Sequence, residues 1–369
     1  MAGDFCPQYR VSHKFNEGDF ASVLEDMKPF IERADYSIVN FECPVTKGGE
    51  KPIVKQGPNL QCSENGIEAV KWVGFDCVTL ANNHFLDYGE KGVRHTLDTC
   101  EKYGVDTVGG GMNLQEASQV LFKEINGVIL AVINCCEHEF SIATENSAGS
   151  NPINLVRQYY AIQEAKGKAD YVLLIVHGGN EYYQLPSPRM KEIYRFFVNA
   201  GADVVVNHHQ HCFSGYELYN GKPIFYGLGN FCFDKLDNES RIWNEGFMVD
   251  ICFDVTISFT IIPYIQCEDR PSVRRMNDKE RCSFEESISV LNNLILNDDL
   301  LLTKYKEFIK GFESIVRVML SPYLSRIGRG LCRRHLLPSF MSPKKKTEIL
   351  GYLECESHFD KVIDYLTRL

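Results

Sequence analysis

Four stretches of this chain share one pattern, in which a largely apolar run of strand length stops at side chains that can bind a metal. The runs occupy residues 36–39, 77–81, 171–176 and 202–206. They are followed by the sequences NFE (40–42), NNH (82–84), HGGNE (177–181) and NHHQH (207–211). Continuous apolar runs of four to eight residues are typical of buried strands in α/β proteins. The pattern therefore predicts a layered α/β fold.

The polar side chains at the ends of these runs are expected to lie together. Open α/β sheets place their ligands just beyond the carboxyl ends of the strands, so four such ends can converge on one site. Histidine is an uncommon core residue, and three imidazoles within residues 208–211 are hard to explain as packing. A metal centre explains them. A purely structural role remains the alternative, particularly for Asn83 and Asp87, whose side chains commonly serve loops and helix caps.

Periodicity divides the chain into a long α/β part and a helical part. Helices are expected at residues 19–33, 63–72 (capped by Ser63), 90–103 and 188–200, and antiparallel strands of a second sheet at 224–226, 247–253 and 255–265. Residues 268–281 are charged, contain Pro271 and are expected to be a linker. Beyond them, residues 284–296, 301–319 and 346–369 have helical apolar spacing. The expected domains are therefore 1–267 and 268–369.

Composition restricts the compartment and the partners. Fourteen cysteines lack CxxC pairs, which favours free thiols in a reducing compartment. The sequence has no recognisable signal peptide and no apolar stretch near 20 residues, so a cytoplasmic protein is expected. The net charge is −10, whereas residues 301–369 hold 13 basic and 7 acidic residues. An acidic domain argues against nucleic acid as the substrate. The basic stretch 314–347 is expected either to lie on an anionic membrane surface or to belong to a helical domain that packs on the α/β domain and turns its basic face to solvent.

The motifs taken together resemble the CapA capsule-synthesis family, which is related to the calcineurin-like metallophosphoesterases. The resemblance covers roughly residues 3–234 and is specific as an ordered set, although each motif alone is weak. The matching segments are Gly3-Asp4, NFECP (40–44), LANNH (80–84) with DYG (87–89), GGG (109–111) with Glu116-Ala117, HGGNEY (177–182), NHHQH (207–211) and YGLGNF (226–231).

This resemblance implies a four-layer α-β-β-α sandwich of metallophosphoesterase type with a helical C-terminal appendage. It also implies one or two divalent ions of Mn, Fe or Zn, with Glu42 in the bridging place. Position 6 is Cys, where phosphoesterases of the wider group have a second ligand His. The ligands carried over from the motifs are Asp4, Glu42, Asn83, His177, His209 and His211.

His84 and Asn83 are expected to act in catalysis, His84 as an acid or as an orienting group near the leaving oxygen. Glu181, His208 and Asn230 are expected to contact substrate, and an exposed surface position is the alternative for Glu181.

The function that the resemblance implies is synthesis or remodelling of a capsular or other extracellular polymer, either poly-γ-glutamate or a polysaccharide. The expected activity is metal-dependent hydrolysis of a phosphoester or γ-glutamyl amide bond by a metal-activated water. The expected substrate is an anionic polymer or a phosphorylated or γ-glutamyl compound. The alternative is a non-catalytic component of a polymer-synthesis complex that retains the cleft for binding.

Overall fold

The computed structural model describes residues 1–236, 241–323, 325–338 and 342–354. The chain divides into two compact units, Met1–Leu301 and Leu302–Leu369, which are described separately below. The predicted domain boundary after residue 267 stays a prediction about the extent of the family domain.

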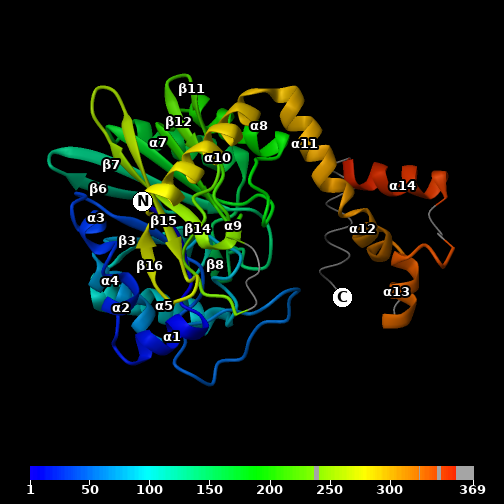
Figure 1. Ribbon diagram of the computed structural model, residues 1–369, viewed down its shortest axis with the longest axis horizontal. Helices are drawn as coiled ribbons and strands as arrows, with labels where there is room; N and C mark the ends of the chain where they lie inside the picture. The colour runs from blue at the N-terminus through cyan, green and yellow to red at the C-terminus, as the bar shows by residue number, and fades with distance from the viewer. Residues whose placement is uncertain (237–240, 324, 339–341, 355–369) are drawn as a thin grey trace. The chain divides into compact units, whose positions relative to one another are not determined.

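The first unit is built on two large sheets (Figure 1). Sheet 1 is entirely parallel, with the order β13 (Asn230–Cys232), β1 (Ala2–Phe5), β2 (Ile38–Phe41), β3 (Cys77–Thr79) and β4 (Asp106–Val108). Sheet 2 has the order β11 (Tyr216–Tyr219), β12 (Lys222–Phe225), β10 (Val204–His208), β9 (Tyr171–His177), β7 (Val128–Cys136) and β6 (Leu121–Ile125). Its inner four strands are parallel, and β6 and β11 are antiparallel edge strands.

Two smaller sheets complete the strands. One is antiparallel and consists of β14 (Glu245–Cys252), β15 (Ser258–Gln266) and β16 (Val273–Arg275). The other pairs β5 (Gly110–Gly111) with β8 (Gly149–Ser150). The helices of the first unit are α1 (Tyr9–Asn16), α2 (Ala21–Leu24), α3 (Lys28–Glu32), α4 (Asn65–Val73), α5 (Gly89–Tyr103), α6 (Leu114–Ala117), α7 (Leu155–Lys166), α8 (Pro188–Asn199), α9 (Arg241–Asn244) and α10 (Asp278–Leu296).

Successive side chains along each strand point to opposite faces of the sheet, so the buried side chains form three separate hydrophobic cores between the layers. In β2, Val39 packs in the core with α4 and α5, whereas Ile38 joins the core between the sheets. In β9, Leu173 joins that central core, whereas Leu174 packs in the core with α7 and α8. Successive strand residues point to opposite faces, so each sheet is covered on both sides. The fold is the four-layer α-β-β-α sandwich that the resemblance implied.

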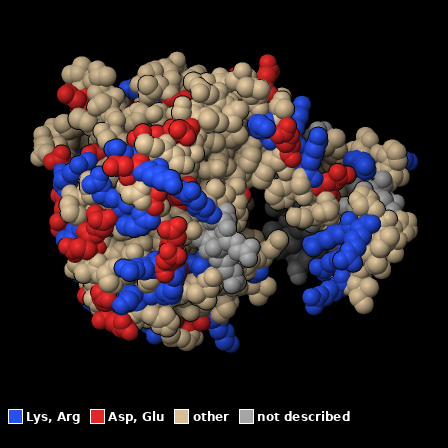
Figure 2. Space-filling view, in the orientation of Figure 1, with Lys and Arg blue, Asp and Glu red and all other residues tan. Residues whose placement is uncertain are grey.

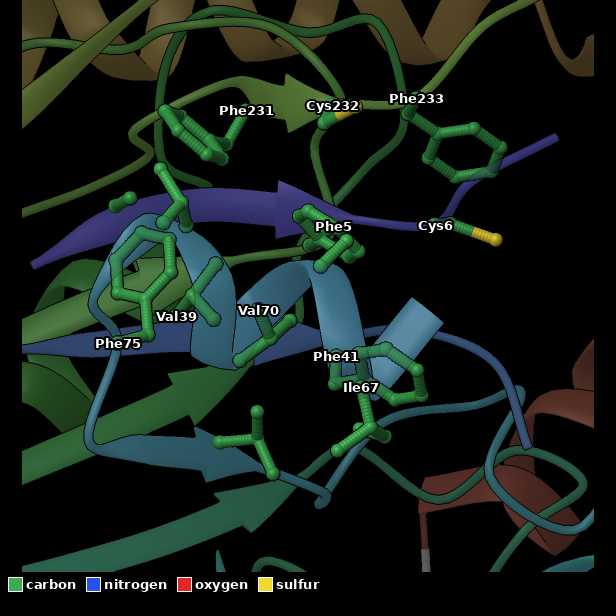
Figure 3. Packing of buried hydrophobic residues seen from close by; sticks show 14 of the residues in the cluster. Phe5, Cys6, Val39, Phe41, Ile67, Val70, Phe75, Phe231, Cys232 and Phe233 are labelled. Atoms are coloured by element: carbon green, nitrogen blue, oxygen red, sulfur yellow. The ribbon is translucent and has the colours of Figure 1, made fainter. Parts of the chain in front are cut away.

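Aromatic packing secures β1 in the middle of sheet 1 (Figure 3). The ring of Phe5 stacks on Phe41 and Phe231, with centroids 5.9 and 6.4 Å apart, and all three are buried. Ile67 and Val70 of α4 belong to the same cluster. Burial of each such side chain contributes about 1.5–3 kcal/mol. The strand that carries Asp4 is therefore held firmly on both sides.

Several sequence-based expectations differ from the structure in detail. The predicted helix 19–33 is two short helices, α2 and α3, because Pro29 lies at the start of the second. Ser63 does not cap α4, since its hydroxyl donates to Asn16 Oδ1. Strand β12 belongs to sheet 2 and does not pair with β14 and β15. Residues 268–281, expected to be a linker, contain β16 and the start of α10.

Helix α10 packs on the central core of the first unit. Phe284 lies 4.8 Å from Phe213 and 5.8 Å from Phe247 between ring centroids, and Asn292 Oδ1 accepts a hydrogen bond of 2.7 Å from the backbone of Tyr216. The apolar face of α10 is therefore covered by the sheets.

The second unit is helical. Helix α11 (Asp298–Lys310) runs into it, followed by α12 (Glu313–Met319), α13 (Arg326–Arg333) and α14 (Pro343–Glu354). The predicted helix 301–319 is thus divided, and the end of the predicted helix 346–369 lies outside the described residues. Thirteen cysteines of the described chain are free, as predicted. No described helix is long and apolar enough to span a membrane.

Candidate metal centre

The side chains predicted to bind metal come from the carboxyl ends of strands in both large sheets. Asp4 lies on β1, Glu42 follows β2 by one residue, and Asn83 lies four residues beyond β3. His177 ends β9, and His209 and His211 lie in the turn after β10. All six side chains are buried. The two sheets thus bring together residues that are up to about 200 positions apart in the sequence.

The backbone at three positions of the centre adopts conformations or close approaches that few residue types allow. A Cβ on Gly3 would lie 1.8 Å from the carbonyl oxygen of Gly229, so only glycine fits before Asp4. His209 and His211 have φ angles of 92° and 54°, in the left-handed region that non-glycine residues rarely adopt. Such strain is common at functional sites, where the surrounding structure holds it in place.

His177 lies close to three of the other candidate ligands. Its Nε2 lies 3.1 Å from Asn83 Oδ1, 3.0 Å from His209 Nδ1 and 3.5 Å from Glu42 Oε1. The Nε2 of His211 lies 3.7 Å from the same oxygen, Glu42 Oε1. Glu42 therefore lies near both imidazoles, as the resemblance implies for a bridging ligand.

The donor set fits a divalent cation. Both carboxylate oxygens of Glu42 are buried, and neither accepts a hydrogen bond from the described part of the chain. A buried carboxylate without donors is costly unless a cation or a proton neutralises it. Ligand atoms of Asp4, Glu42 and His177 lie within 4.8 Å of one another, and so do those of Glu42, His209 and His211. Mixed imidazole and carboxylate donors suit Mn, Fe and Zn.

Burial and neighbouring charges shift the pKa values of the candidate ligands in both directions. Burial raises the pKa of Glu42 well above its usual value. Burial and neighbouring imidazoles hold the pKa of His177 and His209 below the usual range, so both are neutral, as metal ligands must be. Burial alone would lower the pKa of His211, but Glu42 and Asp4 raise it to about 10.

Asp4 is oriented by three neighbours that leave one oxygen facing the cluster. Asn40 Nδ2 donates to Asp4 Oδ1 at 2.8 Å, and His208 Nδ1 lies 3.2 Å from the same oxygen. Burial acts to raise the pKa of Asp4, yet the neighbouring imidazoles of His208 and His211 hold it well below its usual value. Asp4 is therefore an ionised carboxylate in a fixed orientation.

Three residues predicted to contact substrate occupy different surroundings. His208 is buried against Asp4, and Asn230 Oδ1 lies 3.0 Å from His211 Nδ1 while its amide donates to the His211 carbonyl. Both contact candidate ligands, which fits an orienting role better than direct substrate contact. Glu181 is exposed. Substrate binding by these residues stays a prediction.

His84 lies beside the cluster and is held by an acidic partner. Its Nδ1 lies 2.7 Å from Asp87 Oδ2, and the backbone N–H of Leu60 donates to the same oxygen at 2.6 Å. Lys55 forms a buried ion pair with Asp87 Oδ1. The ring is nearly buried, with 9% of its side chain exposed.

An aromatic wall adjoins His211. Tyr182 and Trp243 stack with centroids 5.8 Å apart, and the Trp243 ring lies 4.9 Å from that of His211. Lys235 Nζ lies 4.8 Å above Trp243 and donates to the Tyr182 hydroxyl at 3.1 Å. A cation on an aromatic platform beside the candidate ligands is an arrangement that can receive an anionic group.

Sequence reasoning missed several residues of the centre. Glu139 accepts from Asn83 Nδ2 at 2.9 Å and lies 3.5 Å from His209 Nε2. Asn40 bonds Asp4 and lies 3.3 Å from His177 Nδ1. Asn40 ends one of the apolar runs, so its position carried a signal. Lys55 and Glu139 lie in loops without any pattern that distinguishes them.

The fold and this centre together define a four-layer α/β protein with a buried cluster of carboxylates and imidazoles at the carboxyl ends of its strands. The chain belongs to the bacterial capsule synthesis protein PGA_cap family, whose model matches residues 1–235. It is 35% identical over 243 residues to the capsule biosynthesis protein CapA of Bacillus anthracis, covering 64% of this chain and 59% of that protein. It is 34% identical over 217 residues to the PGA biosynthesis protein CapA of Bacillus subtilis strain 168, covering 58% and 57%. The chain thus spans less than two thirds of these relatives.

The solved structures that align with this chain are distant in sequence. A novel phosphatase from Mycoplasma pneumoniae aligns with a TM-score of 0.43 at 14% identity, covering 72% of this chain and 92% of the other. A hypothetical protein from Thermus thermophilus aligns with a TM-score of 0.44 at 16% identity, covering 71% and 97%.

Proposed function

We propose that this protein is a metal-dependent hydrolase that acts in the synthesis or remodelling of an extracellular anionic polymer. The observation that carries the proposal is Glu42, a buried carboxylate without hydrogen-bond donors in the described structure, at the point where His177, His209 and His211 meet. The family relationship supports a polymer such as poly-γ-glutamate or a capsular polysaccharide.

Each group of residues at the centre has a separate role in this proposal. Asp4, Glu42, Asn83, His177, His209 and His211 would hold one or two divalent ions. Such ions supply a water of lowered pKa and polarise the bond under attack. Asn40 and Asn230 fix the orientation of Asp4 and His211 through the contacts described above. The wall formed by Tyr182, Trp243 and Lys235 would receive an anionic group of the substrate, and His84 would protonate or orient the leaving group.

Phosphoester and γ-glutamyl amide bonds are both candidate targets. Each reaction needs an activated water, a polarised electrophile and a proton donor for the leaving atom. The donor set serves both, and a screen of phosphodiesters, phosphomonoesters and γ-glutamyl peptides would separate them.

A second candidate function is a non-catalytic component of a polymer-synthesis complex that binds its ligand in the same cleft. Cys6 favours it, because a buried thiol stands where phosphoesterases of the wider group have a His, and burial raises the pKa of that thiol. A thiol held in its neutral form is a poor ligand. Binding of an anionic polymer without turnover would support this role.

Elemental analysis of protein purified without chelators tests the metal centre. One or two equivalents of Mn, Fe or Zn are expected in the wild type and none in the His209→Ala, His211→Ala double variant. His138→Ala is the matched control, because this exposed imidazole belongs to the same half of the fold and contacts no candidate ligand in the described structure. Absence of metal from wild type after reconstitution would contradict the proposal.

The basic stretch 314–347 provides a candidate contact with an anionic membrane surface. Arg326, Arg329 and Arg333 are exposed on α13, and Figure 2 shows basic side chains gathered over this helix. Ile327 on the same helix is 77% exposed. Basic and apolar side chains together are typical of helices that lie on anionic lipid. Sedimentation with phosphatidylglycerol vesicles, compared with phosphatidylcholine vesicles, tests this contact and with it the proposed cytoplasmic, membrane-peripheral location.

A further inference from the structure

Lys55 is buried in a loop whose neighbouring side chains face solvent. The loop lies between β2 and α4, and Val54, Gln56 and Pro58 are exposed, whereas only 2% of the Lys55 side chain is accessible. Burying an ammonium group costs several kcal/mol unless a partner compensates it. The sequence around Lys55 supplies no apolar face that would account for its position.

The partner of Lys55 is Asp87, which has no exposed side-chain surface. Lys55 pairs with Oδ1, while Oδ2 receives the His84 imidazole at 2.7 Å and the Leu60 N–H at 2.6 Å. The backbone N–H of Ile53 also donates to the Asp87 carbonyl at 2.9 Å. Both carboxylate oxygens are therefore engaged, and the carboxylate cannot rotate without breaking these contacts.

The contact with His84 makes this ion pair more than a loop anchor. Lys55 Nζ lies 3.1 Å from His84 Nδ1, so the ammonium touches both members of the Asp87–His84 pair. The Lys55 ammonium can only donate hydrogen bonds. When His84 Nδ1 carries the ring proton it cannot accept one, so Lys55 donates to the Asp87 carboxylate. Because Nδ1 faces Asp87 and Lys55, Nε2 lies on the opposite edge of the imidazole. Replacing a buried ion pair by apolar groups often leaves the stability of a protein unchanged or raises it. A contribution to the stability of the loop alone therefore does not explain the buried Lys55–Asp87 pair.

We infer that Lys55 is a positioning residue for His84, completing a buried Lys55–Asp87–His84 triad that fixes the imidazole with Nε2 directed away from the loop. The inference rests on the proposed function in one respect, namely that His84 acts on the leaving group. Lys55 itself is too buried to contact substrate. It acts by holding the Asp87 carboxylate, which in turn holds the ring.

The test compares Lys55→Met with Lys51→Met, an exposed lysine of the same loop. Protein labelled with ¹⁵N-histidine and reconstituted with Zn²⁺ gives imidazole nitrogen signals, and His84→Gln assigns those of His84. Lys55→Met is expected to shift the His84 nitrogen signals while zinc content and the signals of the other imidazoles stay as in wild type. Lys51→Met is expected to change nothing.

Kinetics supply a second readout wherever the wild type hydrolyses a substrate. Lys55→Met should lower kcat by about 10- to 100-fold with KM within about two-fold, since general acid catalysis is worth about 10²–10⁴-fold and only its alignment is lost. If the wild type hydrolyses no phosphodiester, phosphomonoester or γ-glutamyl peptide, the proposed function fails, and the imidazole signals alone decide the role of Lys55.

Two results would overturn the inference. One is a Lys55→Met protein whose His84 signals match wild type. The other is loss of zinc or a change in every imidazole signal, which would make Lys55 a general support of the site. If Lys55→Met does not fold, Lys55→Arg takes its place, because the charge beside Asp87 is kept while the planar guanidinium changes the geometry at His84. The same criteria then apply.

Discussion

Two buried glutamates in this protein have opposite surroundings. Glu217, on the edge strand β11, accepts hydrogen bonds from Arg195 Nε at 2.9 Å, Arg195 Nη2 at 2.6 Å and the Tyr226 hydroxyl at 2.7 Å. Glu42, at the carboxyl end of β2, accepts none from the described residues. Both are almost fully buried. A buried charge that the chain neutralises itself is part of the structure, whereas one left without donors marks a place for a ligand.

The largest expected effect on stability concerns Glu217, the buried carboxylate that accepts hydrogen bonds from Arg195 and Tyr226. Glu217→Gln should lower the free energy of unfolding by about 3 kcal/mol, at the low end of the range for broken buried ion pairs because Arg195 is partly exposed. Urea unfolding measures it, with exposed Glu164→Gln as a control expected within about 0.5 kcal/mol of wild type. Metal content should not change. A loss below about 1 kcal/mol would remove the distinction between the two glutamates.

The next largest expected effect on stability concerns Glu42, the carboxylate without donors, and the divalent cation proposed to bind it. Adding Zn²⁺ or Mn²⁺ at about 100 times its dissociation constant should stabilise the wild type by about 2.7 kcal/mol. The same addition should leave Glu42→Gln nearly unchanged, because the central ligand is lost. Thermal unfolding with and without metal measures both. Equal stabilisation of the two proteins would show that Glu42 is not a ligand.

A smaller effect of opposite sign is expected in chelator. Without metal, Glu42→Gln should be more stable than wild type by about 1 kcal/mol, because the raised pKa of Glu42 means that its carboxylate must take up a proton to be buried as a neutral group, whereas the amide is already neutral. The expected signs for Glu42→Gln and Glu217→Gln are thus opposite under one condition. Destabilisation by both substitutions would mean that Glu42 has a structural partner.

The smallest effect concerns a partnered carboxylate near solvent. Glu280 completes the capping box of α10 and pairs with Arg274, which together hold its pKa at about 2, below the ordinary 4.5. Its contribution is therefore present above pH 4.5 and is lost as the pH falls toward 2. Glu280→Gln should cost less than about 1 kcal/mol at about pH 7, because solvent screens the pair. Urea unfolding at about pH 7 and about pH 3 should show the cost shrinking; a constant cost would rule out ionisation as its source.

Local patterns in the sequence predicted a layered α/β fold and the gathering of polar side chains at the strand ends, whereas the four layers and the places of Asp4 and Glu42 came from the family resemblance. Apolar runs that end in His or Asn place those side chains at the edge of a parallel sheet, whichever strands are neighbours. The helices at 90–103 and 188–200 were likewise predicted almost to the residue, since Gly104 ends α5 in the left-handed conformation and Pro188 begins α8.

Other features depend on contacts that no local pattern encodes. The split of residues 19–33 follows from Pro29, whose effect was visible but outweighed by helical periodicity. The placement of β12 beside β10 is a matter of topology. Lys55 and Glu139 reach the centre from loops, where neither periodicity nor capping identifies a partner. The clustering of the candidate ligands was thus predictable, and the groups that orient them mostly were not.

The chain order of the ligands has a consequence for how the protein is made. Asp4 is synthesised about 200 residues before His209 and His211. Pairing of such distant segments is slow, because chain entropy must be lost before the contacts form. Complete coordination of the proposed metal therefore requires that both sheets have already come together. A nascent chain that ends before residue 209 presents Asp4 and Glu42 without the imidazoles that would complete their coordination.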